Sequence, residues 1–159
     1  MTHVLFVCTG NICRSPLAEV LLRRELDARN IEGITASSAG TGAWDGAPAS
    51  EGAYLVALEH GLDLSAHRAR LLTRDLVQRA DLVFTMARHH RARVQELGGE
   101  NHAHVLGEYA GREGPDAEVA DPFGANIETY RQTYDELDEL IRVALGRLLK
   151  DRDGPDPRQ

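Results

Sequence analysis

The feature that most constrains the fold is a strand pattern that passes through a short loop into a helix pattern at the start of the chain. Residues 3–8, HVLFVC, are apolar and rich in β-branched side chains, which predicts a buried strand. Residues 16–30 place leucine and alanine at helical spacing, and Pro16 suits a first helical turn because its missing N–H has no partner there. A strand, a short loop and a helix in this order form the first part of a βαβ unit.

The same alternation continues along the chain. We expect further strands at 33–40, 81–86 and 102–109, and further helices at 49–61, 87–99 and 126–150. Gly61 predicts the end of the second helix, and Asn126 predicts the N-cap of the last one. Strands that alternate with helices need crossover connections, which give a mainly parallel sheet covered on both faces. The sequence therefore predicts an α/β fold with a four-stranded, mainly parallel sheet in a three-layer sandwich.

Length and charge narrow the class of protein. A chain of 159 residues buries roughly two-thirds of its unfolded surface, so one domain at 1–150 folds without a disulfide or a metal. Residues 151–159, DRDGPDPRQ, predict a disordered tail. The net charge of −7 argues against nucleic acid or an anionic membrane as partner. No signal peptide or membrane span is predicted, and with two cysteines in the chain we expect a cytoplasmic monomer.

Residues 8–15, CTGNICRS, connect the first strand to the first helix. In a parallel sheet, ligands bind at the carboxyl ends of the strands and against helix N-termini. Small residues in such a loop let successive backbone N–H groups turn inward and bind an anion. A nucleotide-binding P-loop requires lysine before its Ser or Thr, whereas Arg14 stands here and the spacing differs. The loop therefore predicts a site for a phosphate-sized oxyanion.

Three side chains give this loop a chemical function. Cys8 lies at the base of the predicted anion site, where the electropositive surroundings favour a thiolate, and a thiolate facing a phosphate monoester is a nucleophile. The planar guanidinium of Arg14 can bind two phosphate oxygens at once, which lysine cannot do. Ser15 can donate a hydrogen bond to the thiolate. We predict Cys8 as nucleophile and Arg14 as phosphate clamp.

The string Cys-Thr-Gly-Asn-Ile-Cys-Arg-Ser-Pro resembles the signature loop of the low-molecular-weight protein tyrosine phosphatases. The resemblance spans residues 3–150 and implies a flavodoxin-like fold, no cofactor, and hydrolysis of phosphotyrosine in proteins through a phosphocysteine, with inorganic phosphate as product. The family has a general acid in an Asp-Pro pair followed by an aromatic residue. Asp121, Pro122 and Phe123 match that pattern, and Asp121 is the expected acid and base.

The resemblance also assigns supporting residues. The phosphate-binding loop would comprise Thr9, Gly10, Asn11, Ile12, Cys13 and Ser15. Asn11 would join Ser38, in an SAG strand end, and His67, in a His-x-x-Arg segment, in a polar network that holds the loop. A strand-end cap for Ser38 and a surface position for His67 are the simpler alternatives.

Two features bear on the substrate. Trp44 and Phe123 are expected to form aromatic walls of the pocket, which suits a planar phosphorylated side chain. Residues 121–141 resemble the protein arginine phosphatases, a subgroup that carries threonine where this chain has Ile12. Because isoleucine offers apolar bulk for a phenyl ring, we predict a phosphotyrosine phosphatase, with an arginine phosphatase on the same machinery as the alternative.

Other functions fit the cysteines less well. Arsenate reduction needs thiols further along the chain, and no cysteine follows Cys13. A non-catalytic phosphate-binding module stays open. Both thiols lie in one loop, so we hypothesise that Cys13 captures an oxidised Cys8 in a reversible disulfide, with helix packing as the alternative role.

The histidines do not predict a metal site. His89 and His90 are adjacent, so they face different sides of a helix, and His102 and His104 have no cysteine or carboxylate framework nearby. All four are expected to be surface histidines.

Overall fold

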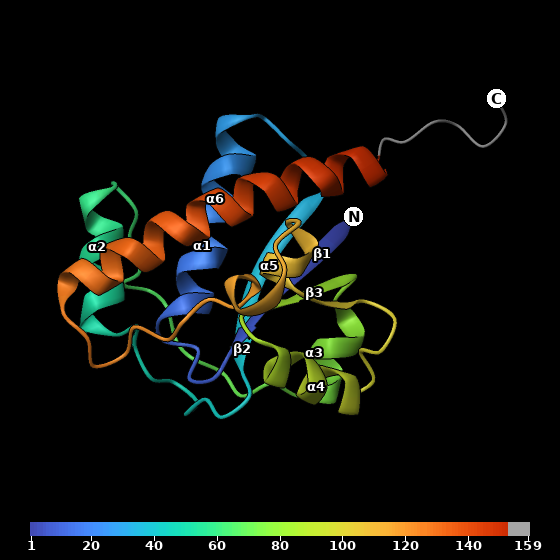
Figure 1. Cartoon of the computed structure of the whole chain (residues 1–159), viewed down its shortest axis with the longest axis horizontal. Helices are drawn as coiled ribbons and strands as arrows, with labels where there is room; N and C mark the ends of the chain where they lie inside the picture. The colour runs from blue at the N-terminus through green and yellow to red at the C-terminus, as the bar shows by residue number, and fades with distance from the viewer. Residues whose placement is uncertain (153–159) are drawn as a thin grey trace, which may run out of the picture.

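The computed structural model describes residues 1–152 and has the predicted alternation of strands and helices (Figure 1). The elements in chain order are β1 (Thr2–Cys8), α1 (Arg14–Ala28), β2 (Ile34–Gly40), α2 (Glu51–Glu59), α3 (Arg74–Arg79), β3 (Leu82–Thr85), α4 (Arg88–Glu96), β4 (Ala103–Val105), α5 (Leu106–Tyr109), the 3₁₀ turn η1 (Gly114–Ala117) and α6 (Ile127–Arg152). The sheet has the order β2-β1-β3-β4 with all neighbours parallel. The α/β class and the four-stranded parallel sheet are confirmed, and the order is that of flavodoxin-like folds.

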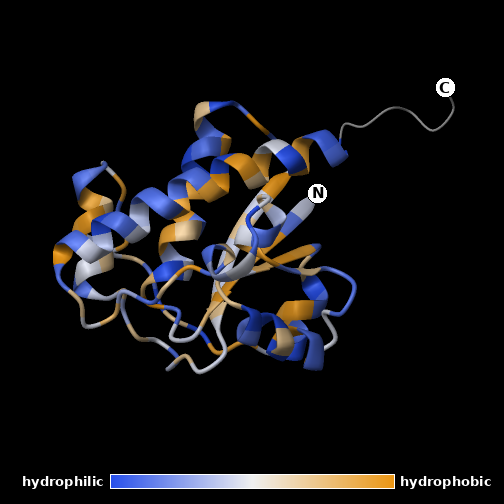
Figure 2. Ribbon diagram, in the orientation of Figure 1, coloured by the Kyte–Doolittle hydropathy of each residue, from blue (hydrophilic) through white to orange (hydrophobic). Residues whose placement is uncertain are grey.

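The central strand β1 divides the core between the two faces of the sheet. Val4, Phe6 and Cys8 belong to the larger apolar cluster, which is built with α1 and α6. Leu5 and Val7 belong to a smaller cluster that includes buried residues of α3 and α4. Since side chains alternate across a strand, this pattern places one layer of helices on each face. Figure 2 shows the matching distribution of apolar residues along the strands and polar residues on the outer helix faces.

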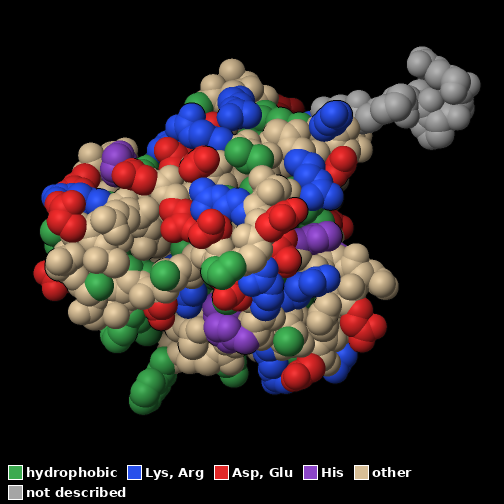
Figure 3. All heavy atoms as spheres, in the orientation of Figure 1, with side chains coloured by type: hydrophobic (Ala, Val, Ile, Leu, Met, Phe, Trp, Pro, Cys, Tyr) green, Lys and Arg blue, Asp and Glu red, His purple; other side chains and the backbone are tan. Residues whose placement is uncertain are grey.

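Helix α6 has the apolar face that the sequence predicts. Its buried residues are Tyr130, Thr133, Tyr134, Leu137, Leu140, Ile141, Ala144, Leu145 and Leu148. Asn126 caps the helix, because its Oδ1 accepts the N–H of Thr129 at 3.0 Å. Charged side chains of both signs are scattered over the face seen in Figure 3. No helix within residues 1–152 is both long and apolar enough to span a membrane.

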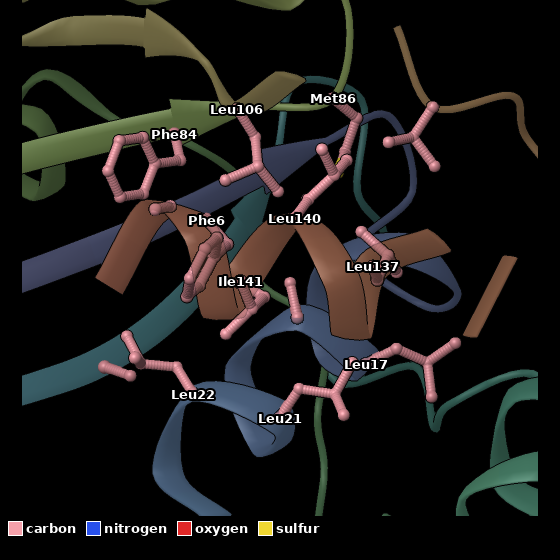
Figure 4. Packing of buried hydrophobic residues seen from close by; sticks show 14 of the residues in the cluster. Phe6, Leu17, Leu21, Leu22, Phe84, Met86, Leu106, Leu137, Leu140 and Ile141 are labelled. Atoms are coloured by element: carbon pink, nitrogen blue, oxygen red, sulfur yellow. The ribbon is translucent and has the colours of Figure 1, made fainter. Parts of the chain in front are cut away.

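The larger cluster fixes α1 and α6 against the sheet (Figure 4). The labelled core comprises Phe6, Leu17, Leu21, Leu22, Phe84, Met86, Leu106, Leu137, Leu140 and Ile141. The start of α1 is therefore held directly beyond the end of β1, which fixes the two ends of the loop between them. This is how the fold positions the predicted anion site.

Most boundaries differ from the prediction by one to three residues, and three further differences concern β4, α3 and α6. The strand expected at 102–109 ends at Val105 and continues as α5, which packs against η1. This contact requires glycine, because a Cβ at Gly107 would lie 2.0 Å from the carbonyl oxygen of Ala117. Helix α3 was not predicted, although Thr73 caps it by accepting the N–H of Leu76 at 3.2 Å. Helix α6 runs to Arg152, so the first two residues of the predicted tail are helical. The rest of that tail, 153–159, lies outside the described residues.

Candidate active site

The loop between β1 and α1 turns its carbonyl groups toward the protein and keeps its N–H groups available. The carbonyl oxygen of Cys8 accepts the N–H of Thr41 at 2.9 Å, and that of Thr9 accepts the N–H of Gly42 at 2.9 Å. No hydrogen bond within residues 1–152 uses a backbone N–H of residues 9–14 as its donor. Such a group of unpaired N–H donors at a helix N-terminus can bind an oxyanion.

Two backbone features allow the loop to close on itself. Asn11 has a φ of 55°, in the left-handed region that asparagine tolerates better than most residues. Gly40 ends β2 directly beneath the loop, where a Cβ would lie 2.4 Å from the carbonyl oxygen of Thr9 and 2.9 Å from the backbone nitrogen of Asn11. Only glycine permits this approach of β2 to the loop, which explains the glycine of the SAG segment.

The thiol of Cys8 has a defined hydrogen-bond partner. Its Sγ lies 2.9 Å from the Oγ of Ser15, and both side chains are buried. Asn11 Nδ2 donates to the same Ser15 Oγ at 2.8 Å. Because that oxygen already accepts from Asn11, its own hydrogen is free to donate to Cys8, which stabilises a thiolate.

The structure brings the predicted network of Asn11, Ser38 and His67 together and adds Arg70 to it. Asn11 Nδ2 donates to Ser38 Oγ at 2.9 Å, and Asn11 Oδ1 accepts the N–H of Arg70 at 3.0 Å. His67 Nε2 donates to the Asn11 carbonyl at 2.6 Å, and Arg70 Nε donates to the Ser38 carbonyl at 2.9 Å. Every polar group of the Asn11 side chain is thus paired, so its amide orientation and its left-handed backbone are fixed.

Arg14 is buried, and the Nε of its guanidinium is unpaired. Its Nη1 donates to the carbonyl of Val119 at 2.9 Å, and its Nη2 lies 3.7 Å from Asp121 Oδ2. Its Nε has no partner, and it is the single buried side-chain nitrogen or oxygen in residues 1–152 without one. An unpaired buried donor is costly, and a bound oxyanion would satisfy Nε and Nη2 together.

These residues line a cavity of about 200 Å³. Its lining residues are Cys8, Thr9, Gly10, Ile12, Cys13, Arg14, Asp121 and Phe123. The half-exposed carboxylate of Asp121 is held by its own loop, since its Oδ1 accepts the N–H of Phe123 at 3.1 Å. The cavity therefore joins a thiol, a guanidinium and a carboxylate beside apolar groups.

Comparison with known proteins identifies this arrangement. The family model described as low molecular weight phosphotyrosine protein phosphatase matches residues 3–153. The chain belongs to this family. It is therefore a hydrolase of the low-molecular-weight phosphatase class, as the resemblance of its loop predicts.

Members of the family with different named substrates are similar to this chain. The protein-arginine-phosphatase of Bacillus subtilis (strain 168) is 37% identical over 151 residues, covering 94% of this chain and 98% of that protein. The low molecular weight protein-tyrosine-phosphatase Wzb of Escherichia coli (strain K12) is 38% identical over 140 residues, covering 88% of this chain and 90% of that protein. A solved structure of the YwlE arginine phosphatase, a cysteine-to-serine mutant with a phosphorylated active site serine, has a TM-score of 0.88 at 36% identity and covers 95% of this chain and 98% of that one.

The phosphate-binding loop is also held by a hydrogen bond from His90, a residue that the sequence did not predict for the site. His90 is fully buried rather than on the surface. Its Nδ1 accepts the N–H of Ala87 at 3.1 Å, so the proton lies on Nε2, which donates to Thr9 Oγ1 at 2.8 Å. Burial lowers the pKa of His90 to about 3, with smaller contributions from His89 and Arg14. His90 therefore stays neutral and keeps this tautomer at neutral pH.

We expect His90→Gln to retain more phosphatase activity than His90→Asn, because the Gln amide can reach Thr9 whereas the Asn amide replaces only the Nδ1 contact. His90→Asn and Thr9→Val should each lower kcat/KM about three- to tenfold, the loss expected for one hydrogen bond. Steady-state kinetics of the three variants test this. Equal activity of the Gln and Asn variants would contradict a role of His90 through Thr9.

The two aromatic residues expected as walls of the pocket lie in different surroundings. Phe123 lines the cavity, but Trp44 is 85% exposed and is not among its lining residues. Trp44 sits on a loop that turns outward, with Asp45 Oδ1 accepting the N–H of Leu71 at 2.7 Å. The prediction that Trp44 is a wall of this cavity is therefore wrong for the structure described.

Cys13 faces away from the polar network. Its Sγ donates to Ser50 Oγ at 3.1 Å and lies 3.4 Å from the hydroxyl of Tyr130. Burial raises the pKa of the Cys13 thiol, and the nearby Asp121 and Cys8 raise it further against the two hydrogen bonds. The Cys13 side chain packs in the larger apolar cluster and also borders the cavity.

The remaining predicted surface histidines lie apart from the cavity. His89 is exposed, and His102 and His104 are half-buried near β4. Within residues 1–152 no three His, Cys, Asp or Glu side chains are grouped so that they could hold a metal ion.

Proposed function

We propose that this phosphatase hydrolyses phosphotyrosine in proteins through a phosphocysteine intermediate. The observation that carries the proposal is the unpaired Nε of the buried Arg14, beside loop N–H groups that have no partner and the Cys8 thiol. A bound phosphate would pair with these donors and place its phosphorus over Cys8.

The two chemical steps follow from the residues in the cavity. Cys8 Sγ attacks phosphorus, the bond from phosphorus to the tyrosyl oxygen breaks, and Asp121 gives its proton to that oxygen. A water molecule then attacks the phosphocysteine, and the Asp121 carboxylate takes the proton of the water as the S–P bond breaks. Inorganic phosphate leaves, and the Cys8 thiolate is restored with the hydrogen bond of Ser15. All of these groups come from one chain, so we propose that the monomer is active.

Ile12 and Phe123 support phosphotyrosine as the substrate. Both contribute apolar surface to the cavity beside the phosphate donors, and this suits a phenyl ring. The alternative is a protein arginine phosphatase. It is favoured by the relative of that name at 37% identity and by Asp121, a carboxylate that could pair with a guanidinium.

Matched peptides that carry phosphotyrosine or phosphoarginine in the same sequence test the substrate. We expect kcat/KM to be at least about tenfold higher for phosphotyrosine, because the Ile12 side chain offers a guanidinium no hydrogen bond. Ile12→Thr should reduce that ratio, and Cys8→Ser serves as the blank. Faster hydrolysis of phosphoarginine by the unmodified protein would establish the alternative.

We also propose that Cys13 protects the nucleophile. Peroxide oxidises the Cys8 thiolate to a sulfenic acid, and the Cys13 thiol then displaces water to form a disulfide. Because the pKa of Cys13 is raised, this second step should become faster as the pH increases. After peroxide treatment, dithiothreitol should restore activity in the unmodified protein and less in Cys13→Ala. Equal recovery in both would contradict the proposal.

A further inference from the structure

A second recess adjoins the active-site cavity and shares Phe123 with it. It has a volume of about 360 Å³ and lies where α2 runs beside the segment that leads into α6 (Figure 1). Its apolar walls come from Leu55, Phe123, Ala125, Ile127 and Tyr130. None of these residues except Phe123 lines the cavity itself, so the recess is a separate space next to it.

The floor of the recess is closed and its polar groups are paired. A Cβ at Gly52 would lie 2.3 Å from the ring of Tyr130, so the ring packs directly on the backbone of α2. The Tyr130 hydroxyl donates to Ser50 Oγ at 3.2 Å, and burial raises its pKa to about 12, so the floor stays uncharged. Glu51 is the one charged side chain among the lining residues, and it is exposed at the rim.

Apolar surface at this place is open to water. Phe123 is 65% exposed and Leu55 is 42% exposed. Apolar side chains that gather beside a binding site, rather than singly, indicate a surface that a partner covers. A substrate whose phosphorylated side chain fills the neighbouring cavity would pass over this surface, because the two spaces share Phe123.

We propose that the recess binds an aliphatic side chain of the phosphoprotein substrate, within about three residues of the phosphorylated one. An extended chain rises about 3.3 Å per residue, so such a residue can reach past Phe123 while the phosphate stays in the cavity. Apolar walls favour an aliphatic side chain, and Glu51 disfavours an acidic one. The inference rests on the proposed function, since only a bound phosphoprotein places a chain here.

The recess is also linked to the general acid. The N–H of Phe123 donates to Asp121 Oδ1 at 3.1 Å, so the position of the Asp121 carboxylate depends on the backbone of Phe123. A side chain that covers Phe123 would therefore also restrain the Asp121 carboxylate. The effect of the flanking residue should thus reach kcat as well as KM.

Phosphotyrosine peptides with leucine or aspartate at each of the three positions on either side test the proposal. The variants are Leu55→Asp and the control Leu58→Asp, since Leu58 is 45% exposed on the same helix but outside the recess. We expect the unmodified protein to favour leucine over aspartate at one position about tenfold in kcat/KM. Leu55→Asp should remove that preference, Leu58→Asp should keep it, and p-nitrophenyl phosphate should be hydrolysed equally by all three.

Two results would overturn the recess as a subsite. One is hydrolysis of the peptides without a leucine preference at any position, and the other is an unchanged preference in Leu55→Asp. Leu55→Ala removes the apolar contact without adding charge, so it should reduce the preference for leucine to a lesser degree. This variant replaces Leu55→Asp in the test if the aspartate variant folds poorly. Failure of the proposed function would give a different result from these two. In that case no phosphotyrosine peptide would be hydrolysed in a way that depends on Cys8.

Discussion

Replacing Cys8 by serine is expected to reduce turnover of every phosphorylated substrate by about 10⁴-fold or more, the scale of loss when an enzyme loses its nucleophile. A serine hydroxyl keeps its proton near neutral pH, and the hydrogen bond from Ser15 stabilises an anion that serine does not form. Single-turnover kinetics with a phosphotyrosine peptide measure the loss. A variant that keeps most of its turnover would show that Cys8 is not the nucleophile.

Binding should survive the same substitution. The donors that hold the phosphate are Arg14 and the N–H groups of residues 9–14, and none of them changes when Sγ becomes Oγ. Inorganic phosphate should bind Cys8→Ser at least as tightly, because the thiolate no longer repels the anion. Calorimetry measures this, with Cys13→Ser as the matched control. Intact phosphate binding in both proteins, together with no turnover by the unmodified protein above the Cys8→Ser background, would favour the non-catalytic module.

The fold was predictable because hydrophobic periodicity is a local property. Residues 3–8 alone predict the strand β1, and the apolar residues of α6 recur at helical spacing from Tyr130 to Leu148. The prediction is wrong at Leu106–Tyr109, where the chain packs Gly107 against the carbonyl of Ala117 and becomes helical. A contact between residues that far apart leaves no periodic signal, so local propensity alone could not reveal it.

The site was predictable to the extent that it is contiguous in sequence. The loop that follows Cys8 carries the nucleophile and Arg14 within a few residues, so a motif identifies both. His90 stands 81 residues from its partner Thr9, and its burial depends on α4 packing against the sheet. For Trp44 the error is the reverse: the sequence predicts a wall of the cavity, but the side chain is exposed to solvent. Side-chain orientation on loops is set by tertiary contacts that the sequence pattern does not encode.

Asp121→Asn should lower kcat for a phosphotyrosine peptide by about 10²- to 10³-fold, the contribution expected of a general acid and base. The amide can still accept the N–H of Phe123, so the loop should keep its shape while it loses the transferable proton. For p-nitrophenyl phosphate the loss should be below about tenfold, because its phenolate leaves readily without a proton, whereas tyrosine has a pKa of about 10.

Asp45→Asn is the matched control for Asp121→Asn. Asp45 is also exposed and also accepts a backbone N–H, from Leu71 at 2.7 Å, but it does not line the cavity. Equal losses for the two substrates, or the same loss in Asp45→Asn, would contradict the assignment of Asp121. The test is decisive because Asp121 is the only carboxylate among the described residues that line the cavity. Any other acid would have to reach the leaving oxygen from outside it, and none of the lining side chains could replace Asp121.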